Sequence, residues 1–477
     1  MVKMMNSIIS RIQKEFNNNP DLIIKDIKLT FKTIYILFLE SVAGSNKVND
    51  YVLKNIIDNK GKITSKNIAS FLAGPNTIKI NNLDTIEFYL TNGFTIIILG
   101  KNVFAIETKA DINRSVTAPD VETSINGPKD SFTECYDINL GLIKRRIKSS
   151  TLKIKEKIIG RKTCTKVGIL YFDDITDTKI IKNIEDKINK IDIDGIVDSS
   201  SLAFLLDGEN KTVYPTIFQT ERPDIVATAL MEGKVAIILD TSPYVLIIPA
   251  FFADFINPNI DNYNKSINVN FIKVLRFIAF FISMITPALY IALIDYNQET
   301  IPTSLLINFA IQRSGVPFPA FVETTVMLLI CEILRESDLR FPSSYGSTIS
   351  ILGAIIIGEA SVAAGIVSPI MIIVVAVTFV SSLIITNSEM NNALRFFRAI
   401  FLIGAGLFGL YGMLLAFLFF IIYTTNTKSF DKFYFAPIVP FEKNYFFNVV
   451  LKRPLKKDKK RSKLFTNKNM IKQKENL

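Results

Sequence analysis

The sequence predicts a multi-pass α-helical membrane domain preceded by a cytoplasmic α/β (α+β) region of two subdomains. Residues 346–386 contain one charged residue, Glu359, and are interrupted near the middle by a serine-proline pair. Because a hydrocarbon core about 30 Å thick requires about 20 apolar residues per helix, this stretch fits two spans joined by a tight turn. Two further uncharged stretches, residues 277–294 and 399–423, also indicate a membrane protein.

Residues 1–150 are predicted to form the first cytoplasmic subdomain. Residues 32–39 and 94–106 are rich in β-branched and aromatic side chains, which favour strands. Residues 47–57 carry apolar side chains at helical spacing. No apolar segment follows the lysine near the N-terminus, so we expect no secretory signal and a subdomain that stays in the cytoplasm.

Residues 151–265 are predicted to form a second subdomain, because the alternation of strands and helices starts again after the basic run at 144–146. The predicted elements are a strand at 167–172, a helix at 179–190 and paired strands at 235–240 and 244–249. The two subdomains together would form the α/β region.

Residues 266–425 are predicted to form the transmembrane domain, with four full spans and one broken or re-entrant segment. That segment, residues 301–340, is moderately apolar, carries Glu323 and Glu332, and is interrupted by glycine and proline. Backbone breaks at membrane depth are tolerated where protein or a water-filled cavity covers them, so both glutamates are candidates for an ion path. An amphipathic helix lying in the membrane interface is the alternative interpretation.

The number of membrane spans depends on which side of the membrane each end of the chain occupies. With the N-terminal subdomains and the tail both in the cytoplasm, the number of spans is even, which four spans and a re-entrant segment satisfy. Arg395 and Arg398 then lie on the outer side, against the positive-inside rule. A fifth span would place these arginines inside and the tail outside, so the count remains open.

Residues 426–477 are predicted to form a basic cytoplasmic tail. The chain has 55 lysines and arginines against 44 aspartates and glutamates, and from Lys428 onward it has 14 basic and 4 acidic residues. A polybasic segment after a membrane helix indicates cytoplasmic retention and contact with anionic lipid. Membrane lipid is therefore an expected partner, and nucleic acid is not.

Catalytic and metal-binding chemistry has little support in the sequence. The chain contains no histidine, which removes imidazole acid–base catalysis and histidine-containing zinc sites. Cys135, Cys164 and Cys331 lie far apart and lack metal-ligand spacing. No glycine-rich phosphate loop of the Walker type is present. We therefore expect no enzymatic activity, no catalytic residue, no metal and no cofactor.

Ordered sequence blocks between about residues 30 and 440 carry a resemblance to a known family. The blocks are Glu122, Gly127-Pro128, Phe132 to Glu134, Asn139, Lys144 to Ile147, Thr220 to Asp224, Leu230 to Lys234, Asp240, Pro243, Pro287 to Tyr290, Gly315 to Pro319, Glu332 to Pro342 and Gly353 to Pro369. In this order they resemble the A subunit of the GerA family of bacterial spore germination proteins. The chain departs from the family at Asp431, where a glycine is usual, and in its lysine-rich tail.

The resemblance implies a multi-pass protein of the spore inner membrane that acts with a permease-like B subunit and a lipoprotein C subunit. It also implies a homo-oligomeric, nutrient-gated ion channel that triggers germination, with the B subunit favoured as the one that binds the germinant. Two alternatives remain open. An accessory homologue would assist the release of small molecules, and a secondary transporter would typically show an internal repeat and more spans.

In the long apolar stretch, several small side chains are predicted to share one face of a helix. At about 100° per residue, the face comprises Ser347, Ser350, Ala354, Gly358, Ser361 and Gly365. It allows either close packing of another helix or the passage of water and ions. Glu359 lies about 120° away, and either faces a lumen, where a ring of carboxylates favours cations, or hydrogen-bonds within a helix contact.

Charged side chains of the soluble region are candidates for contacts between subunits or subdomains. They are Glu134, Arg145, Arg146, Glu221, Arg222 and Asp224. The last three flank the start of a predicted helix that Thr220 would cap and Gly233 would end, where a surface ion-pair cluster is the alternative interpretation. The basic run at 144–146 is either a solvated linker or a patch that meets lipid or a partner, and Glu134 could neutralise it.

Overall fold

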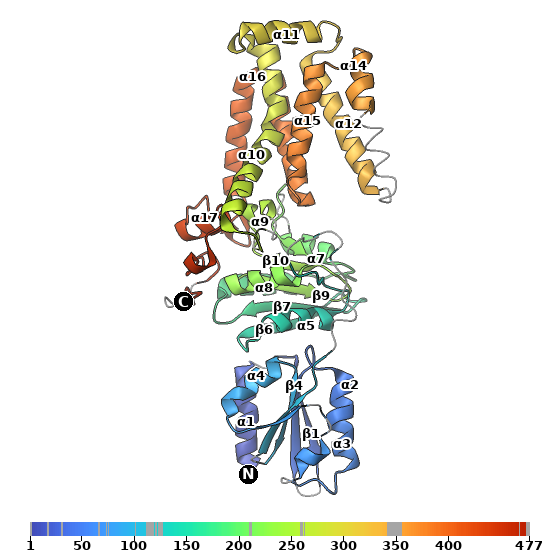
Figure 1. The fold of residues 1–477 in the computed structure, drawn as a ribbon, viewed down its shortest axis with the longest axis vertical. Coiled ribbons are helices and arrows are strands. Elements are labelled where there is room, and N and C mark those ends of the chain that lie inside the picture. Colours follow the sequence, from blue (N-terminus) through green and yellow to red (C-terminus); the bar gives the residue numbers. More distant parts are fainter. Residues whose placement is uncertain are drawn as a thin grey trace.

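The chain folds into two α/β units and a helical bundle, arranged one after another along the long axis of the molecule in a computed structural model (Figure 1). The structure describes residues 2–16, 19–29, 32–64, 67–72, 74, 76–100, 102–110, 119, 122, 127–208, 212–257, 261, 263–340, 355–466 and 468–473. The second unit lies between the first unit and the bundle. Each unit is built on its own sheet, in agreement with the predicted α/β region.

The first unit is an antiparallel sheet with the strand order β1-β2-β4-β5-β3. Its apolar side chains alternate between two faces, of which one packs on α1 and α4 and the other on α2, the π-helix η1 and α3. The bounds are α1 (Val2–Glu15), β1 (Leu22–Lys28), β2 (Thr33–Leu39), α2 (Ser45–Val48), η1 (Asn49–Leu53), α3 (Lys54–Asp58), η2 (Ile68–Phe71), β3 (Thr77–Ile80), η3 (Leu83–Thr85), α4 (Ile86–Thr91), β4 (Phe94–Leu99) and β5 (Asn102–Glu107).

The second unit is an antiparallel sheet with the order β6-β7-β9-β10-β8, covered by α5 and α8 on one face and by α6 and α7 on the other. Its bounds are α5 (Tyr136–Arg146), β6 (Leu152–Ile159), β7 (Thr165–Phe172), α6 (Thr178–Asn189), α7 (Ser199–Asp207), β8 (Phe218–Thr220), α8 (Pro223–Glu232), β9 (Val235–Leu239), β10 (Val245–Ile248) and α9 (Phe252–Ile256). The predicted strand at 167–172, the helix at 179–190 and the pairing of the last two strands are confirmed.

The division between the units lies before the predicted position near residue 150. Helix α5 packs its apolar side, including Leu140 and Ile143, into the core of the second unit. The core boundary therefore precedes α5. Helix α8 ends at Gly233 in the left-handed conformation, as predicted, but its N-cap residue is Arg222 and not Thr220.

The bundle begins with α10 (Ser266–Ile291), which continues into the π-helix η6 (Ala292–Tyr296). It also contains η7 (Gln298–Thr300), α11 (Thr303–Arg313), α12 (Ala320–Arg340), η8 (Ile355–Ala360), α14 (Ser361–Ala363), α15 (Pro369–Leu383) and α16 (Ser388–Asn426). Among the described residues, two helical stretches are long and apolar enough to cross a membrane, Ser266–Tyr296 and Ser388–Asn426, and α15 is a shorter apolar helix.

The segment predicted to be broken or re-entrant has two parts. Helix α11 lies across the end of the bundle that faces away from the sheets, and α12 runs back along the bundle towards them (Figure 1). The break between them is the predicted glycine- and proline-containing turn. The 21 residues of α12 extend over about 30 Å, so the segment is broken into two helices of different direction, as one of the two predicted forms requires.

Gly409 reverses the direction of α16. Its φ of 58° and ψ of −137° are not helical. The ring of Phe397 lies 5.1 Å from that of Phe420 and 5.6 Å from that of Tyr423, whereas a straight helix would separate the first pair by roughly 34 Å. The single span predicted at 399–423 is therefore wrong, and α16 is a hairpin of two antiparallel arms.

The tight turn predicted in the long apolar stretch is present. Ser368 is the N-cap residue of α15 and Pro369 occupies its first position, where the missing N–H costs nothing. Of the arm before this turn, residues 341–354 lie outside the described residues, and they include Ser347 and Ser350.

The predicted face of small residues is not continuous over the described part of that arm. Residues 355–360 form a π-helix, in which hydrogen bonds close wider turns than the assumed α-helical spacing. Gly365 has a φ of 66° in the turn after α14, so it lies beyond the helix. Gly358 and Ser361 remain on helical backbone.

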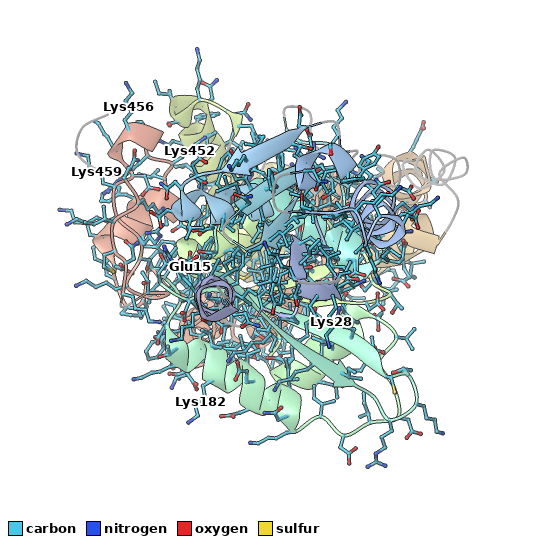
Figure 2. All side chains as sticks on the ribbon, turned by 90° about the horizontal axis from the view of Figure 1, so that it is seen from below. Glu15, Lys28, Lys182, Lys452, Lys456 and Lys459 are labelled. Atoms are coloured by element: carbon cyan, nitrogen blue, oxygen red, sulfur yellow. The ribbon has the colours of Figure 1, made fainter. Side chains whose placement is uncertain are left out.

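The C-terminal tail returns to the second unit. The ring of Phe465 is buried against Phe251 and Tyr445, and its carbonyl oxygen accepts a hydrogen bond from the N–H of Asp177 at 2.9 Å. Lys472 forms ion pairs with Glu232 and with Asp458. Elements of the tail are β11 (Lys428–Ser429), β12 (Lys432–Phe433), α17 (Lys443–Val449) and η9 (Leu455–Lys457). Figure 2 shows Lys456 and Lys459 directed outward at the edge of the molecule.

Candidate functional site

The joint between the two α/β units contains the first of the predicted basic residues. Lys144, at the end of α5, forms a buried ion pair with Asp21 of the first unit. Asp21 also accepts hydrogen bonds from the N–H and hydroxyl of Ser41, both at 2.8 Å. Lys144 therefore belongs neither to a solvated linker nor to a lipid-facing patch, because its charge lies inside the contact between the two subdomains.

The neighbouring candidates lie in different surroundings. Arg146 is half-buried and donates two hydrogen bonds, at 2.5 and 2.7 Å, to the carboxylate of Asp130. Arg145 and Glu134 are exposed, and the backbone carbonyl of Glu134 accepts a bond from Thr241 at 2.8 Å. Glu134 therefore contributes a backbone contact, and the basic run is divided between the core and the surface.

Glu221, Arg222 and Asp224 form a buried cluster at the start of α8. Arg222 donates to both carboxylate oxygens of Asp224, at 3.0 and 2.8 Å, and Asp224 also accepts a bond from the hydroxyl of Tyr263. The surface ion-pair interpretation is wrong, because the side chains of Arg222 and Asp224 are only 4% and 10% exposed. Tyr263 precedes α10, so the cluster ties α8 to the entry of the bundle.

The same cluster holds the connection between the units. Glu122, in that connection, accepts a hydrogen bond from the hydroxyl of Thr220 at 2.5 Å, and its N–H donates to Glu221 at 2.7 Å. Arg222 donates to the carbonyl of Glu122 at 3.2 Å. These bonds fix Glu122 against the start of α8.

Two carboxyl groups in this cluster titrate in opposite senses. Burial raises the pKa of Glu122 to about 6, although the hydrogen bond from Thr220 opposes the shift. Burial also acts to raise the pKa of Asp224, but hydrogen bonds from Arg222 and Tyr263 outweigh it and hold that pKa below its ordinary value. Asp224 thus stays ionised in its pair with Arg222.

Glu323, predicted as an ion-path candidate, lies buried at the end of the bundle away from the sheets. One carboxylate oxygen accepts hydrogen bonds from the N–H and hydroxyl of Ser368, both at 2.6 Å. A carboxylate at this position is stabilised by the positive end of α15. The other oxygen lies 3.9 Å from Arg313, which lies 3.6 Å from Asp295. Glu323 therefore holds the turn between the apolar arms.

Glu332, the second glutamate of α12, lies nearer the sheets among three arginines. Its carboxylate lies 3.0 Å from Arg395, 3.7 Å from Arg335 and 3.7 Å from Arg398. In this environment its negative charge is already paired. A role for Glu332 as an unpaired carboxylate in a cation path is not compatible with these contacts.

Glu359 is placed differently from the other glutamates of the bundle. It is exposed, on the π-helix η8, and none of the described residues forms an ion pair with it. At the adjacent Gly358 a β-carbon would meet no atom of the described residues within 4 Å. Ser361 is half-buried, and Ser350 lies outside the described residues.

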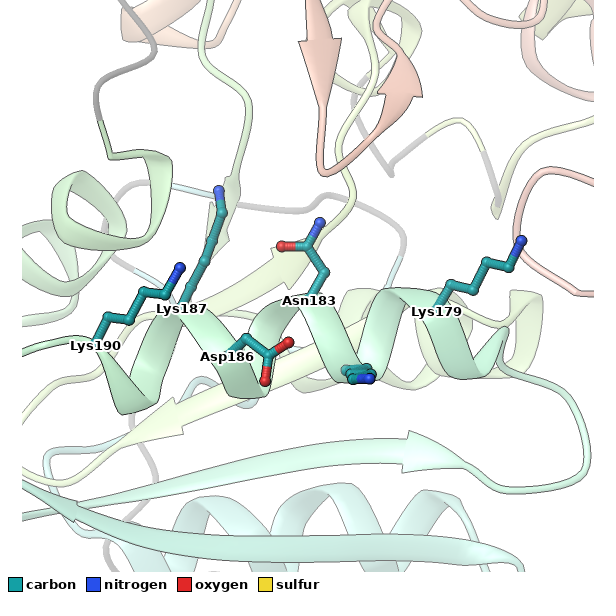
Figure 3. A pocket seen from close by; sticks show the side chains of 6 residues that line it. Lys179, Asn183, Asp186, Lys187 and Lys190 are labelled. Atoms are coloured by element: carbon teal, nitrogen blue, oxygen red, sulfur yellow. The ribbon is translucent and has the colours of Figure 1, made fainter.

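A shallow basic groove of 410 Å³ follows α6 in the second unit. Figure 3 shows Lys179, Lys187 and Lys190 rising from the helix with Asp186 between them. In the described part of the chain, no group of three cysteine, aspartate or glutamate side chains is arranged to hold a metal ion. Cys135 and Cys164 are exposed, and Cys331 is buried.

Several residues of these clusters were not predicted from the sequence. Asp21, Tyr263 and Arg313 occur as isolated residues, and their partners come from distant parts of the chain. For Arg398, the sequence contains a signal that could have predicted its contact with another helix. Pro287 lies inside α10 and leaves the carbonyl of Ser283 without its helical donor, so a donor from another helix is required.

Comparisons with known proteins agree on one family. The sequence model of the Bacillus/Clostridium GerA spore germination protein matches residues 10–464. Spore germination protein KA of Bacillus subtilis (strain 168) is 33% identical over 98% of this chain and 87% of its own length. Spore germination protein GerLA of Bacillus cereus is 30% identical over 91% of this chain and 90% of its own length.

A solved structure also matches. It is the crystal structure of the N-terminal domain of the A subunit of the Bacillus megaterium spore germinant receptor GerK3, with 28% identity, a TM-score of 0.40, and coverage of 51% of this chain and 94% of that chain. The resemblance deduced from the ordered sequence blocks is confirmed by the family match and the relatives. The chain belongs to the GerA family of spore germination proteins, the family of the germinant receptor A subunits.

Proposed function

We propose that this chain is the A subunit of a germinant receptor, and that several copies form a nutrient-gated ion channel in the spore inner membrane. A permease-like B subunit and a lipoprotein C subunit would act with it. The observation that carries the proposal is Glu359, an exposed carboxylate on an otherwise apolar arm. In a bilayer such a group requires water, an ion or a partner, and the described residues of one chain supply no ion pair.

A path between copies is favoured over a path within one copy. The space between α10 and the arms of α16 is filled by buried aromatic side chains, including Phe280, Phe397 and Phe420. Ions would therefore pass where copies of the chain meet. A ring of Glu359 side chains around such a path favours cations.

The contact between the tail and the second unit supports the proposal that both lie on the same side of the membrane. The chain leaves the second unit through α10 and returns to it after α16, so the number of crossings between them is even. We propose that this side is the cytoplasm, because the basic tail follows the last helix.

Two substitutions of Glu359 test the function. Glu359→Gln should preserve folding and weaken cation flux on addition of germinant, and Glu359→Lys should abolish flux through repulsion of cations. Flux and the amount of assembled protein are measured together in spores. Glu299→Gln, an exposed carboxylate outside the apolar arm, serves as the matched control and should leave flux unchanged. Normal flux and assembly in Glu359→Gln would contradict the proposed path.

Assembly is tested separately at Gly358. No described atom lies within 4 Å of a β-carbon there, so the first side-chain atom of a leucine meets none of the described residues, and we expect the substitution to act at a contact with another copy. Gly358→Leu should therefore reduce the oligomer seen by native mass measurement while the monomer remains folded. A wild-type protein that stays monomeric in mild detergent and in lipid would refute the channel of several copies.

A further inference from the structure

An uneven charge balance marks the end of the bundle nearest the sheets. Arg335 of α12 and Arg395 and Arg398 of α16 each lie within 4 Å of Glu332, so among these four side chains the positive charges outnumber the negative ones by two. Their side chains are 14%, 35% and 6% exposed. Excess charge of one sign is costly to hold among packed helices unless a counter-charge is present.

Arg398 is fixed in place by a backbone defect in α10. Pro287 has no N–H, so the carbonyl of Ser283, four residues earlier, cannot be satisfied within the helix. The Nε of Arg398 donates to that carbonyl at 2.8 Å. This bond orients the guanidinium, whose Nη1 then faces Glu332 at 3.7 Å.

The remaining donors of the arginines are incompletely used. The Nη2 of Arg398 and the Nε of Arg395 are buried and have no hydrogen-bond partner among the described residues. Arg335, in contrast, donates to Ser382 at 2.9 Å and lies over the ring of Phe379 at 5.1 Å. The unused donors thus belong to the two arginines of α16, which lie near different oxygens of the Glu332 carboxylate.

The position of the cluster limits what can approach it. Arg395 lies seven residues after the start of α16 at Ser388, which is about 10 Å along the helix from the end that faces the sheets. If the end of the bundle that faces the sheets lies at the level of the lipid headgroups, as in the topology proposed above, this depth corresponds to the boundary between headgroups and acyl chains. Basic pockets between helices at this depth on the cytoplasmic side suit phosphate-bearing headgroups.

We propose that Arg335, Arg395 and Arg398 form a binding site for a phosphate group, supplied by an anionic lipid headgroup or by free phosphate. The phosphate oxygens accept the unused N–H donors of Arg395 and Arg398 and neutralise the excess charge. Planar guanidiniums match phosphate oxygens in geometry as well as charge. The site does not depend on ion conduction, so the proposed channel and this site can fail independently.

The test measures thermal unfolding of the purified full chain in a zwitterionic detergent. Phosphatidylglycerol, phosphatidylcholine and inorganic phosphate are titrated separately, and the unfolding midpoint is followed by circular dichroism. Phosphatidylglycerol should raise the midpoint more than phosphatidylcholine does. A response to phosphatidylglycerol without one to inorganic phosphate identifies a lipid headgroup, and an equal response to inorganic phosphate identifies the free ion.

Two variants, one that removes a positive charge and one that removes a negative charge, make the test specific for the cluster. Arg395→Gln should weaken the apparent affinity roughly tenfold, since one charge-assisted hydrogen bond is lost. Glu332→Gln should strengthen it, because a competing carboxylate is removed. Lys265→Gln, an exposed lysine at the same end of the bundle, is the matched control and should leave the affinity within about twofold.

The outcomes that overturn the site are defined by the same measurements. A wild-type chain that responds to neither phosphatidylglycerol nor inorganic phosphate has no such site. If the unfolding midpoint of Arg395→Gln rises with the added ligand as it does for Lys265→Gln, the arginines serve packing alone. Arg395 is half-buried and does not hold the Ser283 carbonyl, so its variant should fold even if substitution of Arg398 does not.

Discussion

Replacing Gly409 by alanine should disrupt the hairpin of α16. The φ of 58° and ψ of −137° at Gly409 belong to a region that residues with a β-carbon rarely adopt. A β-carbon there would also lie 2.7 Å from Cβ and 2.9 Å from Cγ of Tyr296, and 3.1 Å from Oδ1 of Asn297. The two nearest atoms adjoin the backbone of η6, so rotation of the tyrosine ring cannot relieve the clash.

The cost of this substitution has two independent parts. Backbone strain of this kind costs about 1–3 kcal/mol. Forcing an additional methyl group into a packed site costs about 1–3 kcal/mol more. The sum, roughly 2–6 kcal/mol, is a large fraction of the stability of about 5–15 kcal/mol that is usual for a folded domain.

The assay compares Gly409→Ala with Gly315→Ala in purified full-length protein. Gly315 lies in the break before α12, at the same end of the bundle, and a β-carbon there meets nothing within 4 Å. Yield of monodisperse protein and the thermal unfolding midpoint should fall for Gly409→Ala and stay near wild type for Gly315→Ala. Equal midpoints for the two variants would refute the argument that a glycine turn is required within α16.

Two more predictions concern pH and sidedness. Because burial raises the pKa of Glu122 from 4.5 to about 6, the folded state binds its proton more tightly, and this contribution of roughly 2 kcal/mol is present below pH 4.5 and lost as pH rises through 6. Glu122→Gln should remove that fall in the free energy of unfolding, measured by urea titration, and an unchanged pH slope would contradict the assignment. In a cysteine-free background, a membrane-impermeant maleimide added to intact cells should label Ser304→Cys in α11 and not Lys457→Cys in the tail. Labelling of the tail from outside would refute the common side of tail and sheets.

The two α/β units were largely predictable because their signals are local. Period-two alternation and β-branched residues mark β7, and a proline at the start and glycine at the end mark α8. The assignment of α5 to the second unit was not predictable in this way. Its core contacts join residues far apart in the chain, which no local pattern records.

The contacts of the charged clusters could not be predicted either, because they also join residues far apart in the chain. The sequence placed Arg222 and Asp224 next to each other, and an ion pair at a helix start is usually exposed. Burial of this pair depends on Glu122, one hundred residues earlier, and on Tyr263, after the sheet is complete. The glutamates of the bundle were found as charges in apolar segments, but only the structure separates the paired Glu323 and Glu332 from the exposed Glu359.

The turn at Gly409 removes the conflict in the predicted topology. Counting residues 399–423 as one span forced a choice between a tail inside with Arg395 and Arg398 outside, and the reverse. As a hairpin, α16 runs away from the sheets and back, so it both begins and ends at the side of the sheets. The arginines then lie at the end of the bundle nearest the sheets, on the same side as the tail. A single glycine with a positive φ, invisible to hydropathy because it interrupts no apolar run, thus sets the end of the bundle at which the arginine cluster lies, and the proposed even number of crossings and the proposed phosphate site both depend on it.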